Sequence, residues 1–566
     1  MKLRTVLCAI LVFPLALVAG QGQTKPAPTA AASDIPHLRK QGTATQLIVD
    51  GKPFLALAGE LNNDSATSLE YMKKVWPKLV QAKINLVLAG VSWNQVEHQE
   101  GKFDFSVLDG VIQGARRNNL HLALLWFASW KNSLSSYPPD WVKKDFERFP
   151  RAQTKAGKTV ELLTPLSDAN RDADAHAFAA LMRHVKAVDG QQHTVVMIQV
   201  ENEVGMHGDT RDYSPLANKA FAEPVPKELM DYLQQHKDTL IPEFRQVWEA
   251  GGFKTSGTWE EVFGKGAVTD GYFMAWQYAG AIGRIVNAGK AEYAIPMFVN
   301  AALYGVGRGS QQPASGGRPW DLVMDIWKAG APRLDILGPD AYGNFVEFCA
   351  KYTQQGNPLF IPESLNQAVG AGRVLYAIGR YDAIGFSAMG AVERSNDPDT
   401  ELIGSYDVLG QLAPLILKHQ GDGTMSAVLL APDDPPQKVK VGNYTLEVAF
   451  MKPRVAPLTQ PTPIPPNTFA SAIFIAAGPD EYYVAGNGVI LTFSPNTPGP
   501  PLAGLATVEE GSFVNGRWVP GRLMAGDSTE EGESIRIPWG PGSWVPVYRQ
   551  RSSPNAIQRV TLYRYR

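Results

Sequence analysis

Two glutamates, Glu203 and Glu363, stand where apolar stretches of the chain stop. Residues 196–200 run into Glu201-Asn202-Glu203 and then Gly205, and residues 358–362 run into Glu363-Ser364. An apolar run rich in β-branched residues is typical of a buried parallel strand, whose carboxyl end can deliver side chains to a site. Two strand-terminal carboxylates from distant parts of a chain predict paired-carboxylate chemistry of the kind that hydrolyses glycosidic bonds.

The same pattern recurs along the chain, with apolar strands that end in polar or aromatic residues. The predicted strands are Leu55 to Glu60, Ile84 to Trp93, His121 to Trp130, Thr194 to Glu203, Ile295 to Asn300, Arg333 to Tyr342, Pro358 to Glu363 and Ala383 to Gly390. Amphipathic helical patterns, such as Glu70 to Lys83 and Ser106 to Ala115, separate them. Eight strand-helix repeats predict an α/β fold, a (β/α)₈ TIM barrel, and a doubly wound open sheet is the alternative.

The N-terminus has the composition of an export signal. Lys2 and Arg4 precede an apolar run from Val6 to Val18, and small residues follow at Ala19-Gly20. This pattern predicts a cleavable signal peptide over residues 1–20, too short to span a membrane, and a flexible linker over residues 21–40. We therefore expect a periplasmic or extracellular protein with no membrane contact after signal removal.

Charge and cysteine content narrow the class of partner. The chain has 53 Lys and Arg against 55 Asp and Glu, a balance that argues against nucleic acid or an anionic membrane as a partner. Its two cysteines are Cys8, within the predicted signal, and Cys349, so no disulfide framework is expected. A neutral ligand such as an oligo- or polysaccharide is compatible with these features, and the oligomeric state is left open, with a homo-oligomer as one option.

The helical period disappears after residue 423. Residues 406–419 predict a closing helix, and from about Val428 the chain alternates with period two between Gly- and Pro-rich turns. This change predicts a barrel over residues 41–423, with an insertion after strand four, and an antiparallel β-sandwich over residues 424–566. The Pro-rich stretch 453–467 is interpreted as a long edge loop, with an interdomain linker as the alternative, and the sandwich is expected to brace the barrel rather than to bind polysaccharide.

Several motifs resemble those of bacterial β-galactosidases of families 35 and 42 in clan A that carry a C-terminal β domain. They are Gln199-Val-Glu-Asn-Glu-Val-Gly205, Val91-Ser-Trp-Asn-Gln-Val-Glu-His-Gln-Glu-Gly-Lys-Phe-Asp-Phe105, Ala58-Gly-Glu-Leu-Asn62 and Leu125-Trp-Phe-Ala-Ser-Trp-Lys-Asn132. The resemblance implies that Glu203 is the acid/base, Asn202 its companion and Glu363 the nucleophile. Val204, where family 35 usually has an aromatic residue, and the insertion over 205–292 depart from the pattern.

Other residues at the strand ends are candidate substrate ligands. Tyr342 could donate to Glu363 and hold it ionised, with packing as the alternative role, whereas Glu201 is expected to face away from Glu203 and to be structural. Sugar hydroxyls or rings are expected to contact Glu60, Asn62, Trp93, Asn94, Trp126, Trp130, Asn132 and Tyr342. The alternatives are a helix cap for Asn62 and core packing for each tryptophan. His207 is expected in a solvated loop, and Arg211-Asp212 as a surface pair.

Other chemistries find little support in the motifs. Gly305-Val-Gly-Arg-Gly309 lacks the Lys-Ser/Thr of a phosphate loop, and the chain has neither Gly-x-Ser-x-Gly nor His-Glu-x-x-His. No metal or organic cofactor is expected. We expect a secreted retaining exo-β-galactosidase that hydrolyses terminal β-galactosyl residues by double displacement. The alternatives are another retaining β-glycosidase, acting on xylosides, arabinosides or glucosides, or a non-catalytic carbohydrate-binding barrel.

Overall fold

The computed structural model describes residues 35–206, 208–303, 315–390, 393, 400–452, 463–539 and 556–566. The predicted signal peptide, His207, the Gly305–Gly309 loop and most of the Pro-rich stretch lie outside these ranges. Strand β1 (His37–Gln41) overlaps the last residues of the expected linker and pairs with β2 (Ala44–Val49), which pairs with β3 (Lys52–Phe54).

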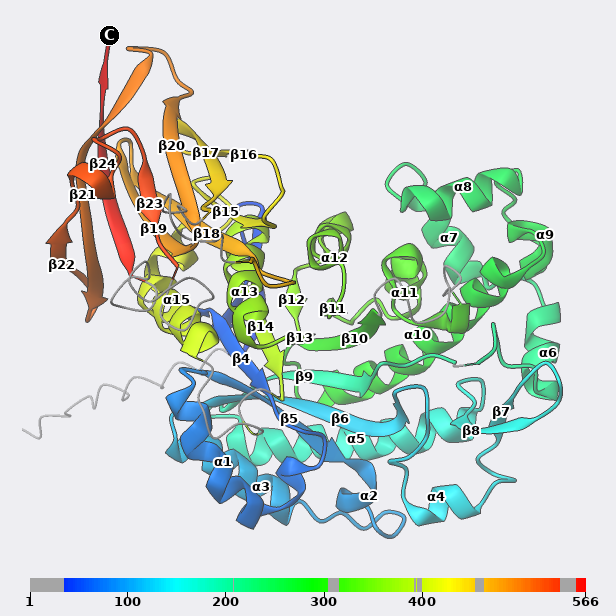
Figure 1. Ribbon diagram of the computed structural model, residues 1–566. Helices are drawn as coiled ribbons and strands as arrows, with labels where there is room; N and C mark the ends of the chain where they lie inside the picture. The colour runs from blue at the N-terminus through cyan, green and yellow to red at the C-terminus, as the bar shows by residue number, and fades with distance from the viewer. Residues whose placement is uncertain are drawn as a thin grey trace, which may run out of the picture. The chain divides into compact units, whose positions relative to one another are not determined.

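A parallel sheet forms the centre of the N-terminal part of the molecule (Figure 1). Its strands run in the order β12-β14-β4-β5-β6-β9-β10-β11-β13. Their bounds are β4 Ala56–Glu60, β5 Leu86–Ser92, β6 His121–Lys131, β9 Val195–Asn202, β10 Met297–Leu303, β11 Ile336–Ala341, β12 Phe360–Ile361, β13 Glu363–Ser364 and β14 Gly385–Met389. All eight predicted strands are present, and the prediction of a TIM-like barrel is confirmed.

The seventh strand consists of two short segments, β12 and β13, because Pro362 interrupts it, and together the two segments close the sheet. A proline has no backbone N–H to give to a ladder, so pairing breaks at this residue. Residues Phe360–Ile361 pair with β14 on one side, and Glu363–Ser364 pair with β11 on the other. The register places Glu363 directly opposite Asp340 at the carboxyl end of β11.

Helices cover the outside of the sheet, one after each strand. They are α1 Leu69–Gln81, α3 Ser106–Arg117, α5 Asp168–Asp189, α10 Ala267–Glu292, α11 Met324–Gly330, α12 Phe345–Tyr352, α13 Gln367–Tyr381 and α15 Thr400–His419. Short helices α2 (Trp93–Val96) and α4 (Asp140–Lys144) and the hairpin of β7 (Arg151–Gln153) and β8 (Thr159–Leu163) lie in the loops. Among the helices of the described ranges, none combines the length and the apolar character that a bilayer span requires.

Both faces of the barrel strands are apolar, because one faces the helices and the other fills the barrel. Ala123, Leu125 and Phe127 of β6 belong to the inner cluster, together with Leu47 of β2. Leu122, Leu124 and Trp126 of the same strand belong to the large cluster under the helices. This double coverage is what allows a parallel strand to be apolar at every position.

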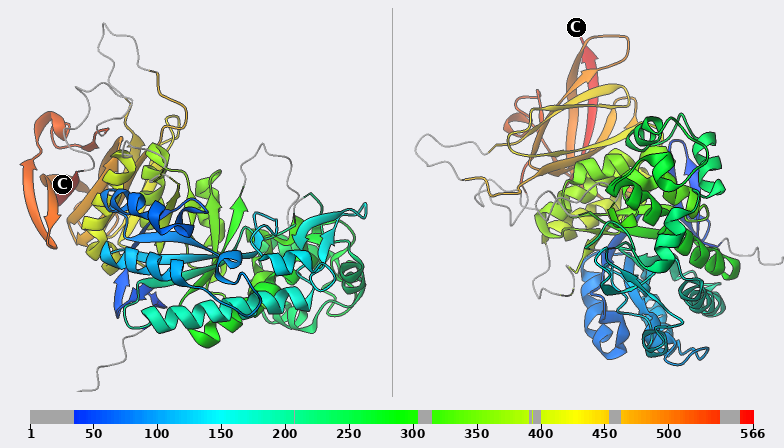
Figure 2. Two further views of the ribbon diagram at one scale, coloured as in Figure 1. Left: turned by 90° about the horizontal axis from the view of Figure 1, so that it is seen from below. Right: turned by 90° about the vertical axis from the view of Figure 1, so that its right-hand side faces the viewer.

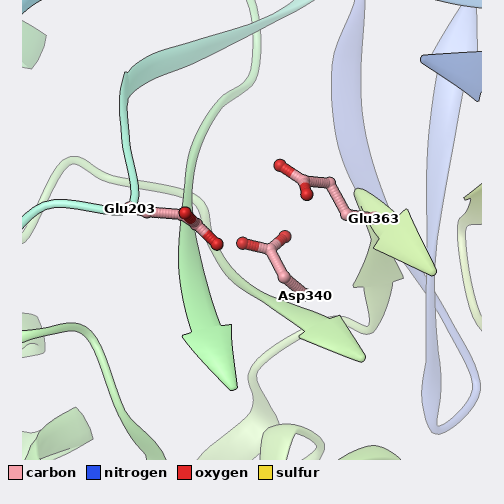
Figure 3. Close-up of side chains that lie close together, drawn as sticks. All are labelled: Glu203, Asp340 and Glu363. Atoms are coloured by element: carbon pink, nitrogen blue, oxygen red, sulfur yellow. The ribbon is translucent and has the colours of Figure 1, made fainter. Parts of the chain in front are cut away.

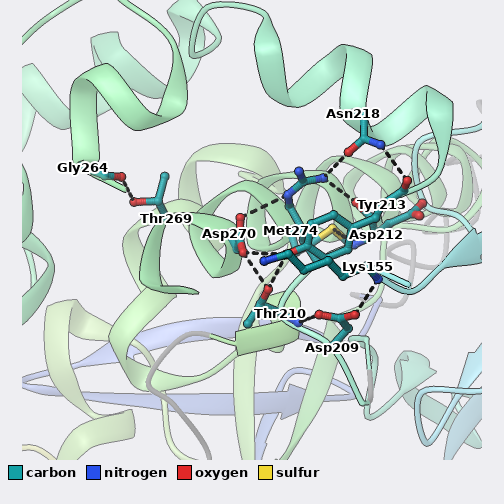
Figure 4. A network of polar contacts seen from close by, with 11 residues as sticks. Lys155, Asp209, Thr210, Asp212, Tyr213, Asn218, Gly264, Thr269, Asp270 and Met274 are labelled. Carbon is teal, nitrogen blue, oxygen red and sulfur yellow. Dashed lines mark hydrogen bonds and ion pairs between the residues drawn. The ribbon is translucent and has the colours of Figure 1, made fainter. Parts of the chain in front are cut away.

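The insertion after β9 is helical and is anchored by a buried polar network (Figure 4). It contains α6 (Pro215–Ala222), α7 (Lys227–Gln235), α8 (Pro242–Ala250) and α9 (Trp259–Phe263). Arg211 bonds Asp270 and Asn218, and Thr210 donates to Asp270 over 2.6 Å. Asp212 is fully buried and accepts from Thr164 and Ser214. The interpretation of Arg211-Asp212 as a surface pair is wrong, because this pair fixes the loop that leaves the fourth strand.

The C-terminal strands form antiparallel sheets with their own core. Figure 2 shows the strands from residue 425 onward, coloured yellow to red, gathered in one all-β region. One sheet runs β15-β18-β19-β24-β21-β22 and the other β16-β17-β20-β23. The bounds are β15 Met425–Leu430, β16 Gln437–Val441, β17 Tyr444–Phe450, β18 Ala470–Gly478, β19 Glu481–Asn487, β20 Val489–Pro495, β21 Leu502–Val514, β22 Arg517–Leu523, β23 Ile535–Ile537 and β24 Ile557–Tyr565. Val428, Leu446, Phe474 and Leu491 share one apolar cluster, as the predicted sandwich requires.

Candidate active site

The carboxyl end of β9 has an irregular backbone that separates its acidic side chains. Glu201 and Glu203 both have positive φ angles, 62° and 46°. Strict alternation along a strand would place side chains two apart on the same face, and the left-handed backbone breaks this alternation. Such angles are costly for non-glycine residues and cluster at functional sites. At Gly205, with φ 137°, a Cβ would lie 2.5 Å from Cγ of Arg318, so only glycine fits there.

Glu201 has the structural role expected from the sequence. Its carboxylate accepts the backbone N–H groups of Ala128, Ser129 and Trp130, at 3.2, 2.9 and 2.8 Å. These donors lie in β6 where its ladder with β9 is irregular, between Trp126 and Lys131. Glu201 therefore satisfies backbone groups that the sheet leaves unpaired. The same irregularity brings Lys131 opposite Asn202.

Glu363 is held by two donors from neighbouring strands. The Tyr342 hydroxyl donates to Oε2 over 2.7 Å, and Nδ2 of Asn300 donates to Oε1 over 3.1 Å. Oδ1 of Asn300 accepts the backbone N–H of Glu203 over 2.9 Å. Asn300 therefore ties the ends of the fourth and seventh strands together. Hydrogen bonds to a carboxylate favour its ionised form.

Glu203, Asp340 and Glu363 face one another at the carboxyl ends of the barrel strands (Figure 3). One oxygen from each carboxyl lies within 4.8 Å of the others, and all three side chains are buried. Within the described residues this is the acidic group with the donor set that a metal ion could use. Asn300 donates to carboxyl oxygens of Asp340 and Glu363, and Tyr342 donates to Glu363. Oxygens that accept such hydrogen bonds fit a cluster of carboxyl groups that share protons.

Burial and mutual repulsion dominate the electrostatics of this site. Burial, together with the nearby Glu203, raises the pKa of Glu363 to about 7, although Lys131, Tyr342 and Asn300 act in the opposite direction. Burial also raises the pKa of Glu203, again against the effect of Lys131. The pKa of Glu60 is raised well above its usual range by burial and by Glu363. Burial and mutual repulsion therefore favour the protonated forms of these carboxyl groups.

Some of the other predicted ligands lie beside this cluster. Glu60 is 3% exposed, and its Oε2 has no hydrogen-bond partner among the described residues. Nδ2 of Asn202 donates to Oδ1 of Asn132 over 2.9 Å, while its Oδ1 accepts from Gln199 over 3.0 Å. These contacts bring Asn132 and Asn202 together and fix the orientation of the Asn202 amide.

Two predicted ligands are engaged elsewhere. Asn62 bonds the carboxylate of Glu393 through both its backbone N–H and its Nδ2, at 2.9 and 2.8 Å, and Ser65 donates to the same carboxylate. Asn94 lines a separate hollow with His98 and Asp140. The structure thus shows Asn62 fixing the loop after the first strand, and it does not bring Asn94 to the carboxyl cluster.

The expectation that the three tryptophans form sugar platforms is wrong in this structure. Trp93, Trp126 and Trp130 are all 0% exposed and belong to the cluster under the helices. Their indole N–H groups are used internally, by Glu97, Asp174 and the carbonyl of Leu163. A ring that is packed against a helix cannot present its face to a ligand.

The sequence analysis did not predict four residues of the site, which are Asp340, Asn300, Lys131 and Arg318. Asp340, Asn300 and Lys131 stand at the ends of strands that were predicted, so their type and position were available signals. Arg318 lies in the segment after β10, where its charge lowers the pKa of Glu203 and its Nη2 lies 3.4 Å from Oγ of Ser133. No strand or motif pointed to Arg318.

Comparison with known proteins finds likenesses to β-galactosidases within the barrel and to a second family in the C-terminal part. Residues 63–263 match the family described as "Beta-galactosidase", and residues 402–536 match a domain of unknown function. A β-galactosidase of Xanthomonas manihotis is 30% identical over 218 residues, which are 37% of this chain and 32% of that protein. The chain thus spans about a third of the length of this relative. The family match contains Glu203 and ends before Glu363.

The solved structures that the chain resembles include one described as a β-galactosidase and one described as a β-amylase. A β-galactosidase from Bacillus circulans sp. alkalophilus is 15% identical with a TM-score of 0.44, covering 64% of this chain and 57% of the other. The catalytic domain of a β-amylase from Paenibacillus polymyxa is 13% identical with a TM-score of 0.42, covering 59% of this chain and 91% of the other.

Proposed function

We propose that this chain, of which residues 63–263 match a β-galactosidase family, is a glycoside hydrolase and specifically a retaining exo-β-galactosidase. The observation that carries the proposal is the approach of the Glu203 and Glu363 carboxyl groups to within 4.8 Å at the carboxyl ends of two barrel strands. Retaining enzymes place their carboxyl groups about 5 Å apart, whereas inverting enzymes leave a wider gap for a water molecule.

The surroundings of the two glutamates support different roles. Glu363 accepts hydrogen bonds from Tyr342 and Asn300, which favour the ionised form that a nucleophile needs. The backbone N–H of Glu203 donates to Asn300, and burial raises the pKa of the Glu203 carboxyl group, so this group can hold the proton that the leaving oxygen requires. Glu363 attacks the anomeric carbon while Glu203 protonates the leaving group, and Glu203 then activates water to release the sugar.

The residues around the pair can bind the sugar that reacts. The amide nitrogen of Asn202 carries two hydrogens and gives one to Asn132, so the other can donate to the 2-hydroxyl. That hydrogen bond strengthens as the oxocarbenium-like transition state develops. Glu60 is buried, and its Oε2 has no partner in the part of the chain that the structure describes, so this oxygen can accept from another sugar hydroxyl. Galactose is the preferred sugar because the family match is to β-galactosidases.

The exo mode and the location rest on other grounds. Action on terminal residues follows from the resemblance to family 35 and 42 enzymes. Export to the periplasm or medium follows from the predicted signal over residues 1–20. Sequencing the N-terminus of protein from its native host tests export: a start near Gln21 supports it, and an intact Met1 on soluble cytoplasmic protein contradicts it.

A panel of nitrophenyl glycosides tests the activity. Hydrolysis of the β-galactoside supports the proposal. Preference for a xyloside, arabinoside or glucoside would change the proposed sugar specificity and leave the proposed reaction class in place. If no glycoside of the panel is hydrolysed, the proposed function is rejected, and the non-catalytic carbohydrate-binding barrel becomes the alternative to test. Proton NMR of the product tests the mechanism, because retention releases the β-anomer first, and initial release of the α-anomer would reject double displacement.

A further inference from the structure

Asp340 lies between the two glutamates of the proposed mechanism but has no part in it (Figure 3). It stands at the carboxyl end of β11, opposite Glu363 on one side and Ala302 on the other. Its side chain is 0% exposed, and one of its oxygens lies within 4.8 Å of oxygens of Glu203 and Glu363. A third buried carboxyl group this close to two others would repel them strongly if all three were ionised.

The two oxygens of Asp340 have different surroundings. Oδ2 accepts a 2.9 Å hydrogen bond from Nδ2 of Asn300. Oδ1 is buried and receives no hydrogen bond from the described donors. Figure 3 shows a carboxyl oxygen of Asp340 pointing at the carboxyl group of Glu203. Because ionised carboxylates only accept hydrogen bonds, two of them can face each other in this way only if one carries a proton.

The charges around Asp340 favour its neutral form. Glu203 faces it from β9, Glu363 from β13 and Glu60 from β4, while Tyr342 follows it on its own strand. Lys131 and Arg318 provide positive charge, which acts on Glu203. Burial, and then repulsion from Glu363, raises the pKa of Asp340 well above its usual range. Buried carboxyls that cannot all ionise share protons.

We propose that Asp340 is a positioning residue that remains a neutral carboxylic acid and donates its O–H to the carboxyl group of Glu203. This inference rests on the proposed function, because it assigns Asp340 a role toward the acid/base. A divalent cation bound by the three carboxyl groups is the competing account, and it requires Asp340 to be ionised.

The hydrogen bond acts when the charge of Glu203 changes. In the first step Glu203 gives its proton to the glycosidic oxygen, which takes the electron pair of the breaking bond to the anomeric carbon. The Glu203 carboxylate left behind accepts from the Asp340 O–H, which stabilises the charge. In the second step Glu203 takes a proton from water while the water oxygen bonds the anomeric carbon and Glu363 leaves. Asp340 keeps its own proton throughout.

The variants Asp340→Asn and Asp340→Ala test whether Asp340 acts as a neutral hydrogen-bond donor or as an ionised carboxylate. Asparagine has nearly the shape of a neutral aspartic acid and retains a donor, so its kcat on an aryl β-galactoside should stay within a few-fold of the native enzyme. Alanine should lower kcat about 10- to 100-fold, the value of a hydrogen bond to a charged group. The loss should be greatest for substrates with poor leaving groups, because Asp340 acts through Glu203.

Infrared difference spectra provide a reading that does not depend on activity. At neutral pH the carbonyl band of protonated carboxyl groups should lose the component of one group in Asp340→Asn, while the components of the other protonated carboxyls remain. The matched control is Asp335→Asn on the same chain segment, because Asp335 is in an ion pair with Lys290 and its replacement should leave that band intact.

Each result decides the proposal. An undiminished protonated-carboxyl band in Asp340→Asn, or a loss of activity as large in the asparagine variant as in the alanine variant, overturns it. Loss of native activity in a chelator, restored by a divalent cation, overturns it in favour of a metal site. If the native protein hydrolyses no glycoside, the proposed function fails, and the infrared band still shows whether Asp340 is neutral or ionised.

Discussion

The hydroxyl of Tyr342 donates to Oε2 of Glu363 over 2.7 Å, joining the carboxyl ends of the sixth and seventh strands. The pKa of Tyr342 is raised by burial and by Glu363, so the phenol stays protonated and remains a donor. Tyr342 is therefore always the donor in this hydrogen bond, which stabilises the ionised form of Glu363. This relationship gives a direct test of which carboxyl group is the nucleophile.

Tyr342→Phe should move the acid limb of the pH profile to higher pH. Glu363 must be ionised to attack, and its pKa of about 7 should rise when the donor is lost. A shift of about one pH unit corresponds to the lower range of a hydrogen bond to a charged group. The measurement is kcat/KM against pH, with the exposed Tyr563→Phe as control. An acid limb that stays in place would disconnect Tyr342 from the titrating group.

Lys131→Met should shift both limbs of the profile. Lys131 is 7% exposed and lowers the pKa of Glu363 and of Glu203, so its loss should raise both values and move the whole bell to higher pH. Tyr342→Phe should move the acid limb alone. Lys144→Met, at an exposed ion pair with Asp140, is the matched control. A profile that loses height without moving would assign Lys131 to substrate binding instead.

Glu201→Ala should destabilise the fold. It leaves the backbone N–H groups of Ala128 and Trp130 without their acceptor, while Ser129 keeps a 3.2 Å bond to Asp174. Unsatisfied buried donors predict a loss of about 3 kcal/mol in the free energy of unfolding. Denaturant titration measures it. Glu161→Ala, which removes an exposed partner of Arg151, should change stability by no more than about 0.5 kcal/mol. Equal effects of the two substitutions would show that Glu201 does not support the irregular strand.

The sequence was sufficient to predict the strands, because hydrophobic runs and their polar ends identify elements of a parallel sheet. It was not sufficient to predict which face of β6 each aromatic residue occupies. Trp126 points at the helices and Phe127 into the barrel, yet both lie in an unbroken apolar run. Where both faces of a sheet are buried, hydrophobicity carries no information about direction.

The site shows the same division between position along a strand and direction of the side chain. Glu203 and Glu363 could be located because they end strands. The inward orientation of Lys131 depends on the register shift between β6 and β9, which lies between Trp126 and Lys131. The separation of Glu201 from Glu203 depends on their two positive φ angles. Neither feature has a signature in residue type. Asp340 was available from its strand-terminal position, but its role depends on proximity to two carboxyl groups distant in sequence.

Replacing each glutamate by alanine should separate the two proposed roles. Glu363→Ala removes the nucleophile, so hydrolysis of every substrate should fall, whatever its leaving group. Glu203→Ala removes proton donation, worth roughly 10²- to 10⁴-fold, which natural glycosides need far more than dinitrophenyl glycosides. Formation of the glycosyl-enzyme from an activated substrate should be spared in this variant, while its hydrolysis slows.

Azide should restore turnover in Glu203→Ala, because it attacks the glycosyl-enzyme without help from a base, and the product should be the β-glycosyl azide. The native enzyme should form little of this product, since Glu203 directs water to the intermediate and its charge repels the anion. Product NMR and burst kinetics make the measurement. Rescue of Glu363→Ala with formation of the β-azide would reverse the two roles, and full activity in both variants would place the reaction outside this carboxyl cluster.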